Sequence, residues 1–138
     1  MSERLQTVMG AGPTGRILCL DFDGVLHSYK SGWKGATVIP DPPVVGMAKF
    51  LESVVDKFYV TVFSNRSLLP GGIQAMRQWM QDALIKDMPD EWWKVFNRLH
   101  WPTEKPAAFL TLDDRAVTFT GEWPEVEELE KFKSWTGD

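Results

Sequence analysis

The fold of this 138-residue chain is decided by the stretch Ile17-Leu18-Cys19-Leu20-Asp21-Phe22-Asp23-Gly24-Val25. Its first four residues are apolar without a break, which is typical of a strand buried on both faces of a parallel sheet. Two carboxylates follow with one residue between them, so an extended backbone directs both to the same side. Gly24 then permits a sharp turn of the chain. The stretch therefore predicts a buried strand that ends in a pair of acidic side chains.

Two further apolar runs end in polar residues in the same way. Residues 58–63 are followed by Ser64-Asn65-Arg66, and residues 107–112 are followed by Asp113-Asp114-Arg115. Both runs have the length and composition of buried strands. We therefore expect three strands of one sheet to end in side chains that could carry chemistry.

Two weaker strand signals accompany these runs. Residues 116–119 have the composition of a fourth strand, and Leu99-His100-Trp101 could form a short one. Too few residues separate Trp101 from the run at 107–112 for a helix to connect two parallel neighbours. The arrangement of this edge of the sheet is left open by the sequence.

Helical spacing of apolar residues predicts four helices. The first begins at Asp41, which can cap it, and has Pro42 in its first turn. A short helix carries Trp92, Trp93 and Phe96, and a last one starts at Pro124. The second helix follows residues 70–72 and buries one face made of Ile73, Met76, Met80 and Leu84.

Strands that alternate with helices indicate an α/β fold. We expect a three-layer, Rossmann-like sandwich with a mainly parallel sheet and helices on both of its faces. In such sheets ligands bind beyond the carboxyl ends of the strands. The polar residues after the three apolar runs are placed at those ends.

Length and composition fit one soluble globular domain over residues 1–138, with residues 1–15 as a loose lead-in. The single cysteine, Cys19, excludes an internal disulfide framework and fits a cytoplasmic protein. No uncharged apolar run is long enough for a membrane helix, and we expect no membrane partner. The net charge of −4 gives no overall basic field for nucleic acid, so such a partner would have to be held locally.

Four carboxylates are expected at the ends of two buried strands. Asp21 and Asp23 follow the first strand, and Asp113 and Asp114 follow the third. These groups would repel one another, which raises pKa values, unless a cation lay among them. Mg²⁺ is a hard cation that prefers oxygen ligands, so the sequence predicts a magnesium site formed by these four residues.

The four ordered motifs of the haloacid dehalogenase-like (HAD) superfamily resemble Asp21-Phe22-Asp23-Gly24-Val25, Ser64, Lys105 and Asp113-Asp114. The resemblance extends from residue 17 to residue 119. Most members of this superfamily are phosphatases or phosphotransferases. The resemblance implies a HAD-like hydrolase domain and a phosphomonoesterase that acts through an aspartyl-phosphate intermediate.

The resemblance also implies a role for each matching residue. Asp21 would be the nucleophile, and Asp23 would act as general acid and then as general base. Mg²⁺ would be held by Asp21, by the backbone carbonyl of Asp23, and by Asp113 or Asp114. Ser64 and the N–H groups near it would bind phosphoryl oxygens, with Asn65 and Arg66 as further phosphate-binding residues and Lys105 as the neutralising cation.

Lys105 departs from the usual spacing of the superfamily, because it stands only eight positions before Asp113. Many relatives have about twice this distance, with a helix between, and the deoxyribonucleotidase branch has a similarly short interval. A lysine placed before the third apolar run should lie at the far end of that strand unless a loop folds it back. Whether Lys105 reaches the site is left open.

The gaps between the motifs predict a capless protein. Residues 24–41 have room for a β-flap but not for a cap domain, so the site is expected to be open, or covered by another subunit of a homo-oligomer. Trp33 or Tyr29 in this flap could stack on a base, with Lys30 and Lys34 beside a phosphate chain. His27 is expected to make local hydrogen bonds rather than to act as a catalyst.

The predicted substrate is therefore a phosphorylated molecule, with a nucleotide or a nucleic-acid end favoured by the flap and by the short interval after Lys105. A sugar-phosphate phosphatase is an alternative. A HAD-fold binding or regulatory module without turnover is a third hypothesis.

Overall fold

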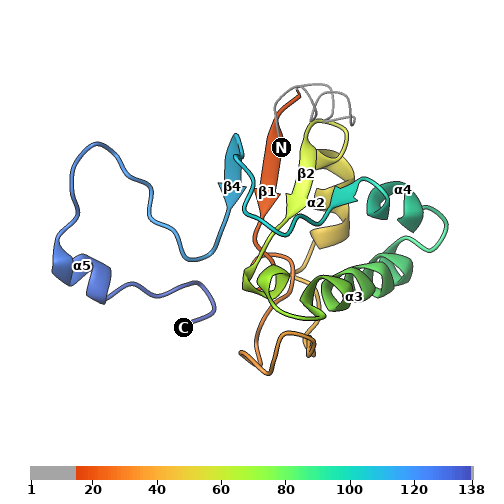
Figure 1. The fold of residues 1–138 in the computed structure, drawn as a ribbon, viewed down its shortest axis with the longest axis horizontal. Coiled ribbons are helices and arrows are strands. Elements are labelled where there is room, and N and C mark those ends of the chain that lie inside the picture. Colours follow the sequence, from red (N-terminus) through yellow and green to blue (C-terminus); the bar gives the residue numbers. More distant parts are fainter. Residues whose placement is uncertain (1–14, 138) are drawn as a thin grey trace.

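The computed structural model describes residues 15–137 and shows an α/β fold (Figure 1). Within these residues the sheet has four parallel strands in the spatial order β3-β2-β1-β4. The strands are β1 (Ile17–Leu20), β2 (Tyr59–Val62), β3 (Leu99–His100) and β4 (Leu110–Leu112). The helices are α2 (Met47–Val54), α3 (Gly72–Asp87), α4 (Trp92–Phe96) and α5 (Val126–Glu130), with a 3-10 turn, η1 (Asn65–Leu68).

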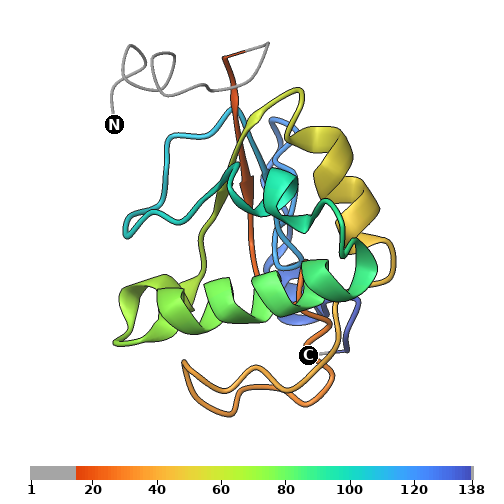
Figure 2. The same ribbon diagram turned by 90° about the vertical axis from the view of Figure 1, so that its right-hand side faces the viewer.

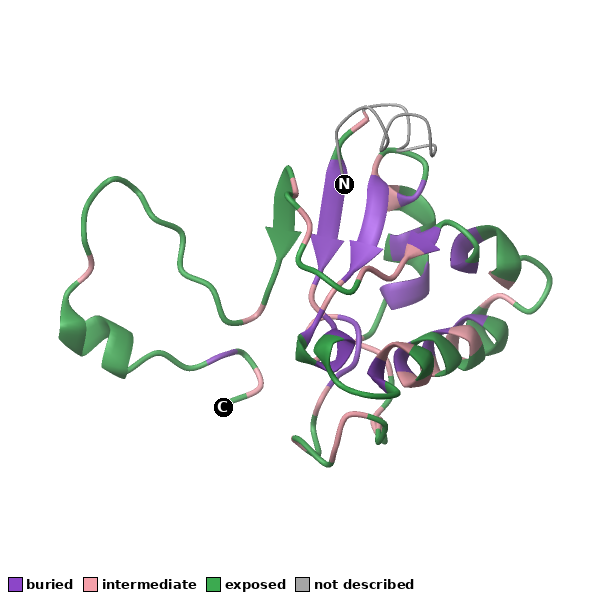
Figure 3. Ribbon diagram, viewed as in Figure 1, coloured by how far each residue is buried: buried purple, intermediate pink, exposed green. Residues whose placement is uncertain are grey.

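The two central strands are buried along their whole length, as their unbroken apolar composition predicts (Figure 3). Leu18 of β1 pairs with Val60 of β2, and Leu20 pairs with Val62. By contrast, all three residues of the edge strand β4 are exposed. The strand predicted at 107–112 is thus confirmed in its last three residues, and the short strand at 99–101 in its first two.

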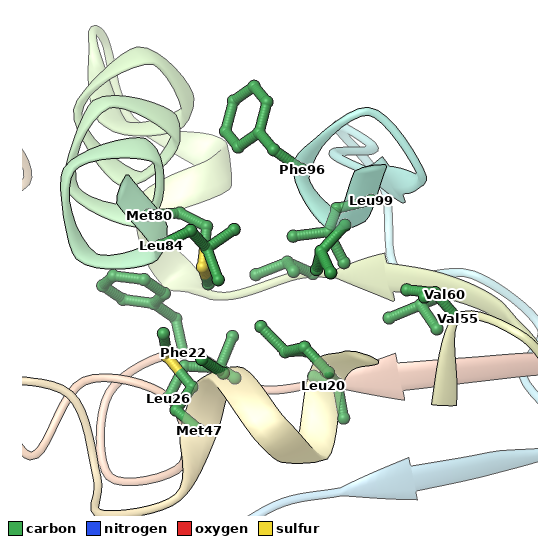
Figure 4. Close-up of a cluster of buried hydrophobic side chains, with 14 of the residues drawn as sticks. Leu20, Phe22, Leu26, Met47, Val55, Val60, Met80, Leu84, Phe96 and Leu99 are labelled. Carbon is green, nitrogen blue, oxygen red and sulfur yellow. The ribbon is translucent and has the colours of Figure 1, made fainter. Parts of the chain in front are cut away.

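The hydrophobic core lies on one face of this sheet (Figure 4). Leu20 and Val62 point to that face, where they join Leu51 of α2, Met80 of α3 and Phe96 of α4 in one cluster. In α3 the buried residues Met76, Met80 and Leu84 follow helical spacing, which confirms the predicted helix and its buried face.

The opposite face of the sheet differs from the three-layer prediction. In the described part of the chain it carries Ile17 and Tyr59, against which Ala108 packs, and no helix joins them. Figure 2 shows the segment after β3 on the side of the sheet away from α2. The connection from β3 to β4 is too short for a helical crossover, so an irregular segment covers this face instead. A parallel sheet with helices on one face is therefore the observed arrangement.

Two predicted helix starts were placed too early. Helix α2 begins at Met47 rather than near Asp41, after Gly46 with φ 87°. The Asp41 carboxylate cannot cap the helix, because it accepts hydrogen bonds from the backbone N–H and the hydroxyl of Ser31, at 2.7 and 2.6 Å. The last helix, α5, begins at Val126 rather than at Pro124 and buries none of its residues.

The strand predicted at 116–119 is absent, since these residues run as exposed chain beyond β4. They belong to a C-terminal arm, residues 115–133, which leaves the sheet in a wide arc through α5 (Figure 1). The predicted lead-in lies outside the described residues apart from Gly15. No helix within residues 15–137 has the combined length and apolar character needed to cross a membrane.

The buried face of α3 generates a stability prediction. Met80 is fully buried, whereas Ile85 on the same helix is 38% exposed. We expect Met80→Ala to lower the free energy of unfolding by about 2–5 kcal/mol, because it removes core contacts and leaves a cavity. Ile85→Ala, the matched control, should cost no more than about 1 kcal/mol. Urea denaturation would measure both, and similar losses in the two variants would contradict the assigned core.

Candidate active site

The strand order brings three polar strand ends to one edge of the sheet. Strand β1 lies between β2 and β4, and all three run in the same direction. The backbone N–H of Asp21 donates to the carbonyl of Leu112 at 3.0 Å, and that of Phe63 donates to the carbonyl of Leu20 at 3.1 Å. Asp21, Ser64 and Asp113 follow these paired residues directly, so the sheet places them side by side.

Three of the four predicted metal-binding carboxylates form an acidic cluster. One carboxylate oxygen from each of Asp21, Asp113 and Asp114 lies within 4.8 Å of the others, so the three could hold a metal ion. Asp21 and Asp114 are half-buried, and Asp113 is exposed. Carboxylate oxygens are the ligands that hard divalent cations prefer, so the donor set fits the predicted metal. Asp23 is not part of this cluster.

Gly24 makes the position of Asp114 sterically accessible. Its φ is 85°, in the left-handed region that favours glycine, and a Cβ at this position would lie 2.2 Å from Oδ2 of Asp114. Any other residue would therefore push Asp114 away from Asp21. Gly24, where the sequence predicts a sharp turn, thus also leaves room for the carboxylate of Asp114.

The electrostatics of the cluster are dominated by Asp21. Burial, together with the charge of Asp113 and a hydrogen bond with Asp114, raises the pKa of Asp21 to about 7. A hydrogen bond from the backbone of Phe22 acts the opposite way. The raised pKa means that negative charge at this point is not compensated by the protein, and a bound cation would supply the compensation.

Asp23 has a different environment, although only one residue separates it from Asp21. Its Oδ1 lies 2.8 Å from Nδ1 of His27, and its Oδ2 accepts a hydrogen bond from Nε of Arg66 at 2.9 Å. The Nε2 atom of the buried His27 accepts from the backbone N–H of Asp41 at 3.1 Å. Nδ1 therefore carries the proton and donates it to Asp23. His27 makes local hydrogen bonds, as predicted, and together with Arg66 it fixes the orientation of the Asp23 carboxylate.

Arg66 is fully buried and has a structural role that the sequence does not predict. Besides Asp23, it binds the flap: its Nη1 donates to the carbonyls of Gly35 and Ala36 at 2.8 and 2.9 Å. The guanidinium also lies 4.7 Å from the centre of the Trp33 ring. Its Nη2 has no hydrogen-bond partner within the described residues, but this atom is buried and Arg66 does not line the cavity that holds Asp21, so a phosphate could reach Nη2 only if the groups around it moved. Arg66 is thus an anchor for the flap rather than an exposed cation.

Ser64 and Asn65 lie where the sequence predicts, at the end of β2. Ser64 is buried and caps η1, and its hydroxyl oxygen accepts from the backbone N–H of Arg66 at 2.9 Å. Both residues line a cavity of about 140 Å³ together with the acidic side chains. We call it the acidic cavity; its lining residues are Asp21, Asp23, Tyr29, Trp33, Ser64, Asn65, Asp114, Arg115 and Thr136.

Lys105 is not brought into the acidic cavity. It is exposed and lines a separate cavity of about 540 Å³ on the sheet face that lacks helices, beside Tyr59 and His100. Its charge does reach β1, since it lowers the pKa of the Cys19 thiol against the stronger, raising effect of burial. Lys105 therefore lies on the helix-free face of the sheet, outside the acidic cavity.

The structure adds one segment to the site that the sequence does not indicate. Thr136, near the end of the described chain, lines the acidic cavity, and the indole N–H of Trp135 donates to the carbonyl of Gly24 at 2.6 Å. These partners are 111 positions apart. No local pattern around Trp135 could have predicted this contact.

The raised pKa of Asp21 generates a prediction for the metal-free protein. The folded state keeps the Asp21 proton up to about pH 7, whereas the unfolded chain loses it near the ordinary value of 3.8. Stability therefore falls as the pH rises through this window. We expect Asp21→Asn to raise the free energy of unfolding by about 2 kcal/mol at pH 8 and to change it little at pH 4.

Urea denaturation in the presence of a chelator would measure this difference. Asp56→Asn is the matched control, because the side chain of Asp56 is 65% exposed and lies in an ion pair with Arg98. It should not stabilise the protein at either pH. An equal effect of Asp21→Asn at both pH values would contradict the raised pKa of Asp21.

We compared the chain with protein-family models, with curated proteins and with solved structures. None of the three comparisons finds a match. The resemblance to the HAD-like superfamily accordingly stays a prediction, carried by the residues that form its motifs. The parallel α/β fold and the acidic cluster of Asp21, Asp113 and Asp114 stand independently of it.

Proposed function

We propose that this protein is a Mg²⁺-dependent phosphomonoesterase of the HAD type, without a cap domain, in which Asp21 is the nucleophile. One observation carries the proposal: Asp21 shares an uncompensated acidic cluster with Asp113 and Asp114, while Asp23, two positions later, is held by Arg66 and His27. Two neighbouring carboxylates in such different environments can take different roles in one reaction.

Asp21 and one or both of Asp113 and Asp114 would hold Mg²⁺. When bound, the ion would neutralise charge between the carboxylate and the phosphate, so that the two anions can approach. In this proposal the backbone carbonyl of Asp23 is a further ligand, as the HAD resemblance implies. The half-buried positions of Asp21 and Asp114 would keep the ion at the inner end of the acidic cavity.

Asp21 would attack the phosphorus atom of a phosphate monoester in line with the leaving oxygen. The new bond joins an Asp21 carboxylate oxygen to phosphorus, and the bond from phosphorus to the leaving oxygen breaks. Asp23 would donate a proton to that oxygen. Water would then attack the aspartyl-phosphate, Asp23 would take a proton from it, and inorganic phosphate and free Asp21 would result.

Arg66 and His27 hold Asp23 in position for this use. Both donate to its carboxylate, which suits the step in which Asp23 takes a proton from water; for the first step Asp23 must enter the reaction carrying a proton. Their hydrogen bonds of 2.9 and 2.8 Å occupy one lone pair on each Asp23 oxygen and fix the plane of the carboxylate. The proton would move through the remaining lone-pair positions, and Asp23 lines the acidic cavity. Arg66 and His27 therefore act as positioning residues rather than as catalytic residues.

Ser64 and Asn65 would bind the phosphoryl oxygens, because they line the same cavity from the end of β2. Within the described residues, the hydroxyl of Ser64 has only the sulfur of Met76, at 3.6 Å, as a hydrogen-bond acceptor. Sulfur is a weak acceptor, so this hydroxyl can donate to a phosphoryl oxygen instead. Lys105 would have to move from its present position to neutralise the transferring group.

The flap suggests the class of substrate. Trp33 is 48% exposed, with Arg66 stacked on its ring, and it lines the acidic cavity with Tyr29. Tyr29 adopts φ 59°, and it is the one non-glycine residue with positive φ in the described part of the chain. Aromatic side chains beside a phosphate site, with Lys30 and Lys34 exposed nearby, favour a nucleotide or the phosphorylated end of a nucleic acid.

A binding or regulatory module without turnover is the second candidate function. The observation in its favour is the position of Lys105, which lines the other cavity and leaves the acidic cavity without its predicted cation. Both functions require phosphate binding, but only the enzyme hydrolyses the ester. The two are therefore distinguished by turnover.

Hydrolysis of p-nitrophenyl phosphate tests the proposed reaction. We expect activity that requires Mg²⁺ and falls at least about a thousandfold in Asp21→Asn, which keeps the size of the side chain but removes the nucleophilic charge. Asp56→Asn, the same change at an exposed position far from the cavity, should retain the wild-type rate. Activity that survives in Asp21→Asn would exclude the proposed mechanism. No activity in the wild type on a broad phosphate panel would favour the binding module.

The flap lysines generate a separate prediction about substrate. We expect Lys30→Ala/Lys34→Ala to raise KM for a phosphorylated oligonucleotide more than KM for p-nitrophenyl phosphate, and more strongly at low salt, because the lysines would contact the phosphate chain. Lys49→Ala/Lys86→Ala removes two exposed lysines from α2 and α3 and controls for net charge. Equal effects of the flap variant on both substrates would count against a nucleic-acid end.

A further inference from the structure

The end of the described chain forms one wall of the acidic cavity. Residues 134–136, here called the C-terminal strap, return from the arm to the carboxyl end of the sheet, beside the flap (Figure 2). Ser134 is 6% exposed and its hydroxyl lies 2.8 Å from that of Thr136. Trp135 binds the carbonyl of Gly24, and Thr136 lines the cavity itself.

The strap binds the part of the site that carries a metal-binding acid. Gly24, whose carbonyl accepts the hydrogen bond from Trp135, is also the residue whose missing side chain makes room for Asp114. The strap therefore closes the cavity on the side of the acidic cluster. The chain between β1 and α2 forms only the flap, so it supplies no cap domain to cover the cavity.

With the strap in place, the acidic cavity is too small for a whole nucleotide. Its volume is about 140 Å³, whereas sites that enclose a drug-sized ligand have about 300–1,000 Å³. The cavity has room for a cation and a phosphoryl group. A large leaving group must lie outside it, beyond the flap residues Tyr29 and Trp33 or beyond the strap, which both line the cavity.

The strap is held by few contacts. The Trp135 ring is 63% exposed, so the hydrogen bond of its indole to Gly24 contributes more than burial does. The chain before it, including Phe132 and Lys133, is exposed, and α5 buries no residue. Apart from Ser134, which is buried, the strap and the chain before it bury little surface, so the strap can leave its position without unfolding the rest of the protein.

We propose that the C-terminal strap is a displaceable wall, and that Trp135 sets the size of the leaving group that the site accepts. This inference rests on the proposed phosphatase function. A small phosphate ester reacts under the closed strap, whereas a phosphorylated polynucleotide end must first displace Trp135 from Gly24. The strap competes with the large substrate, so the closed fraction of the protein lowers the apparent affinity for that substrate.

The substrate preference of Trp135 variants tests this role. We expect Trp135→Ala to raise the ratio of kcat/KM for a 5′-phosphorylated oligonucleotide to kcat/KM for acetyl phosphate by about tenfold, which is near the net effect of one ordinary hydrogen bond. Trp135→Phe, which loses the N–H but keeps a ring, should give part of this increase. Trp123→Ala is the matched control, since Trp123 is 86% exposed on the arm. An unchanged or lower ratio in Trp135→Ala would overturn the proposal.

A second measurement follows the strap without turnover. The Asp21→Asn variant would be labelled with 5-fluorotryptophan and its fluorine NMR spectrum recorded. The signal of Trp135 is identified as the one that disappears when Trp135→Phe is added. We expect it to move toward the solvent-exposed Trp123 signal when Mg²⁺ and the phosphorylated oligonucleotide are added, and to stay in place with Mg²⁺ and inorganic phosphate. A signal that responds to neither probe, or equally to both, would overturn the strap. Loss of all hydrolysis in every variant would instead overturn the phosphatase function, so the two failures are distinguishable.

Discussion

The burial of Asp21 beside two further carboxylates, at the end of two parallel strands, is the constraint on which the site depends. Strands β1 and β4 pair in register and in the same direction, so Asp21 and the pair Asp113 and Asp114 must leave the sheet at the same edge. Asp21 is half-buried and lies beside the charges of Asp113 and Asp114, and its pKa is raised to about 7 as a result. The fold thus holds together an arrangement that only a proton or a cation makes favourable, which is the basis of the proposed metal site.

The neighbouring Asp23 shows how the same short stretch supports a second, compensated charge. Arg66 is buried because it satisfies several groups at once: the Asp23 carboxylate, three flap carbonyls and the ring of Trp33. Removing this one side chain would leave a half-buried carboxylate without its cation and the flap without its anchor. The flap, the proposed general acid and the aromatic wall of the cavity are therefore coupled through a single guanidinium.

Local sequence patterns predicted the elements that depend on nearby residues or on burial along their whole length. The unbroken apolar runs of β1 and β2 and the helical spacing of Met76, Met80 and Leu84 needed no knowledge of the rest of the chain. The predictions that failed depend on contacts between residues that lie farther apart in the sequence. Asp41 is a residue type that caps helices, but its carboxylate accepts a hydrogen bond from the Ser31 hydroxyl instead. Arg66 is buried, and its Nε donates to Asp23, 43 positions earlier. Residues 116–119 favour a strand by composition but find no neighbour, and the contact of Trp135 joins residues 111 positions apart.

The central claim is that acids from β1 and β4 share one cation beside a phosphoryl group bound to Asp21. A crystal structure with Mg²⁺ and beryllium fluoride tests it most directly. We expect one ion in contact with Asp21 and with Asp113 or Asp114, and the fluoride group on a carboxylate oxygen of Asp21. An ion bound elsewhere, or Asp21 free of beryllium fluoride while the acids of β1 and β4 point apart, would contradict the account.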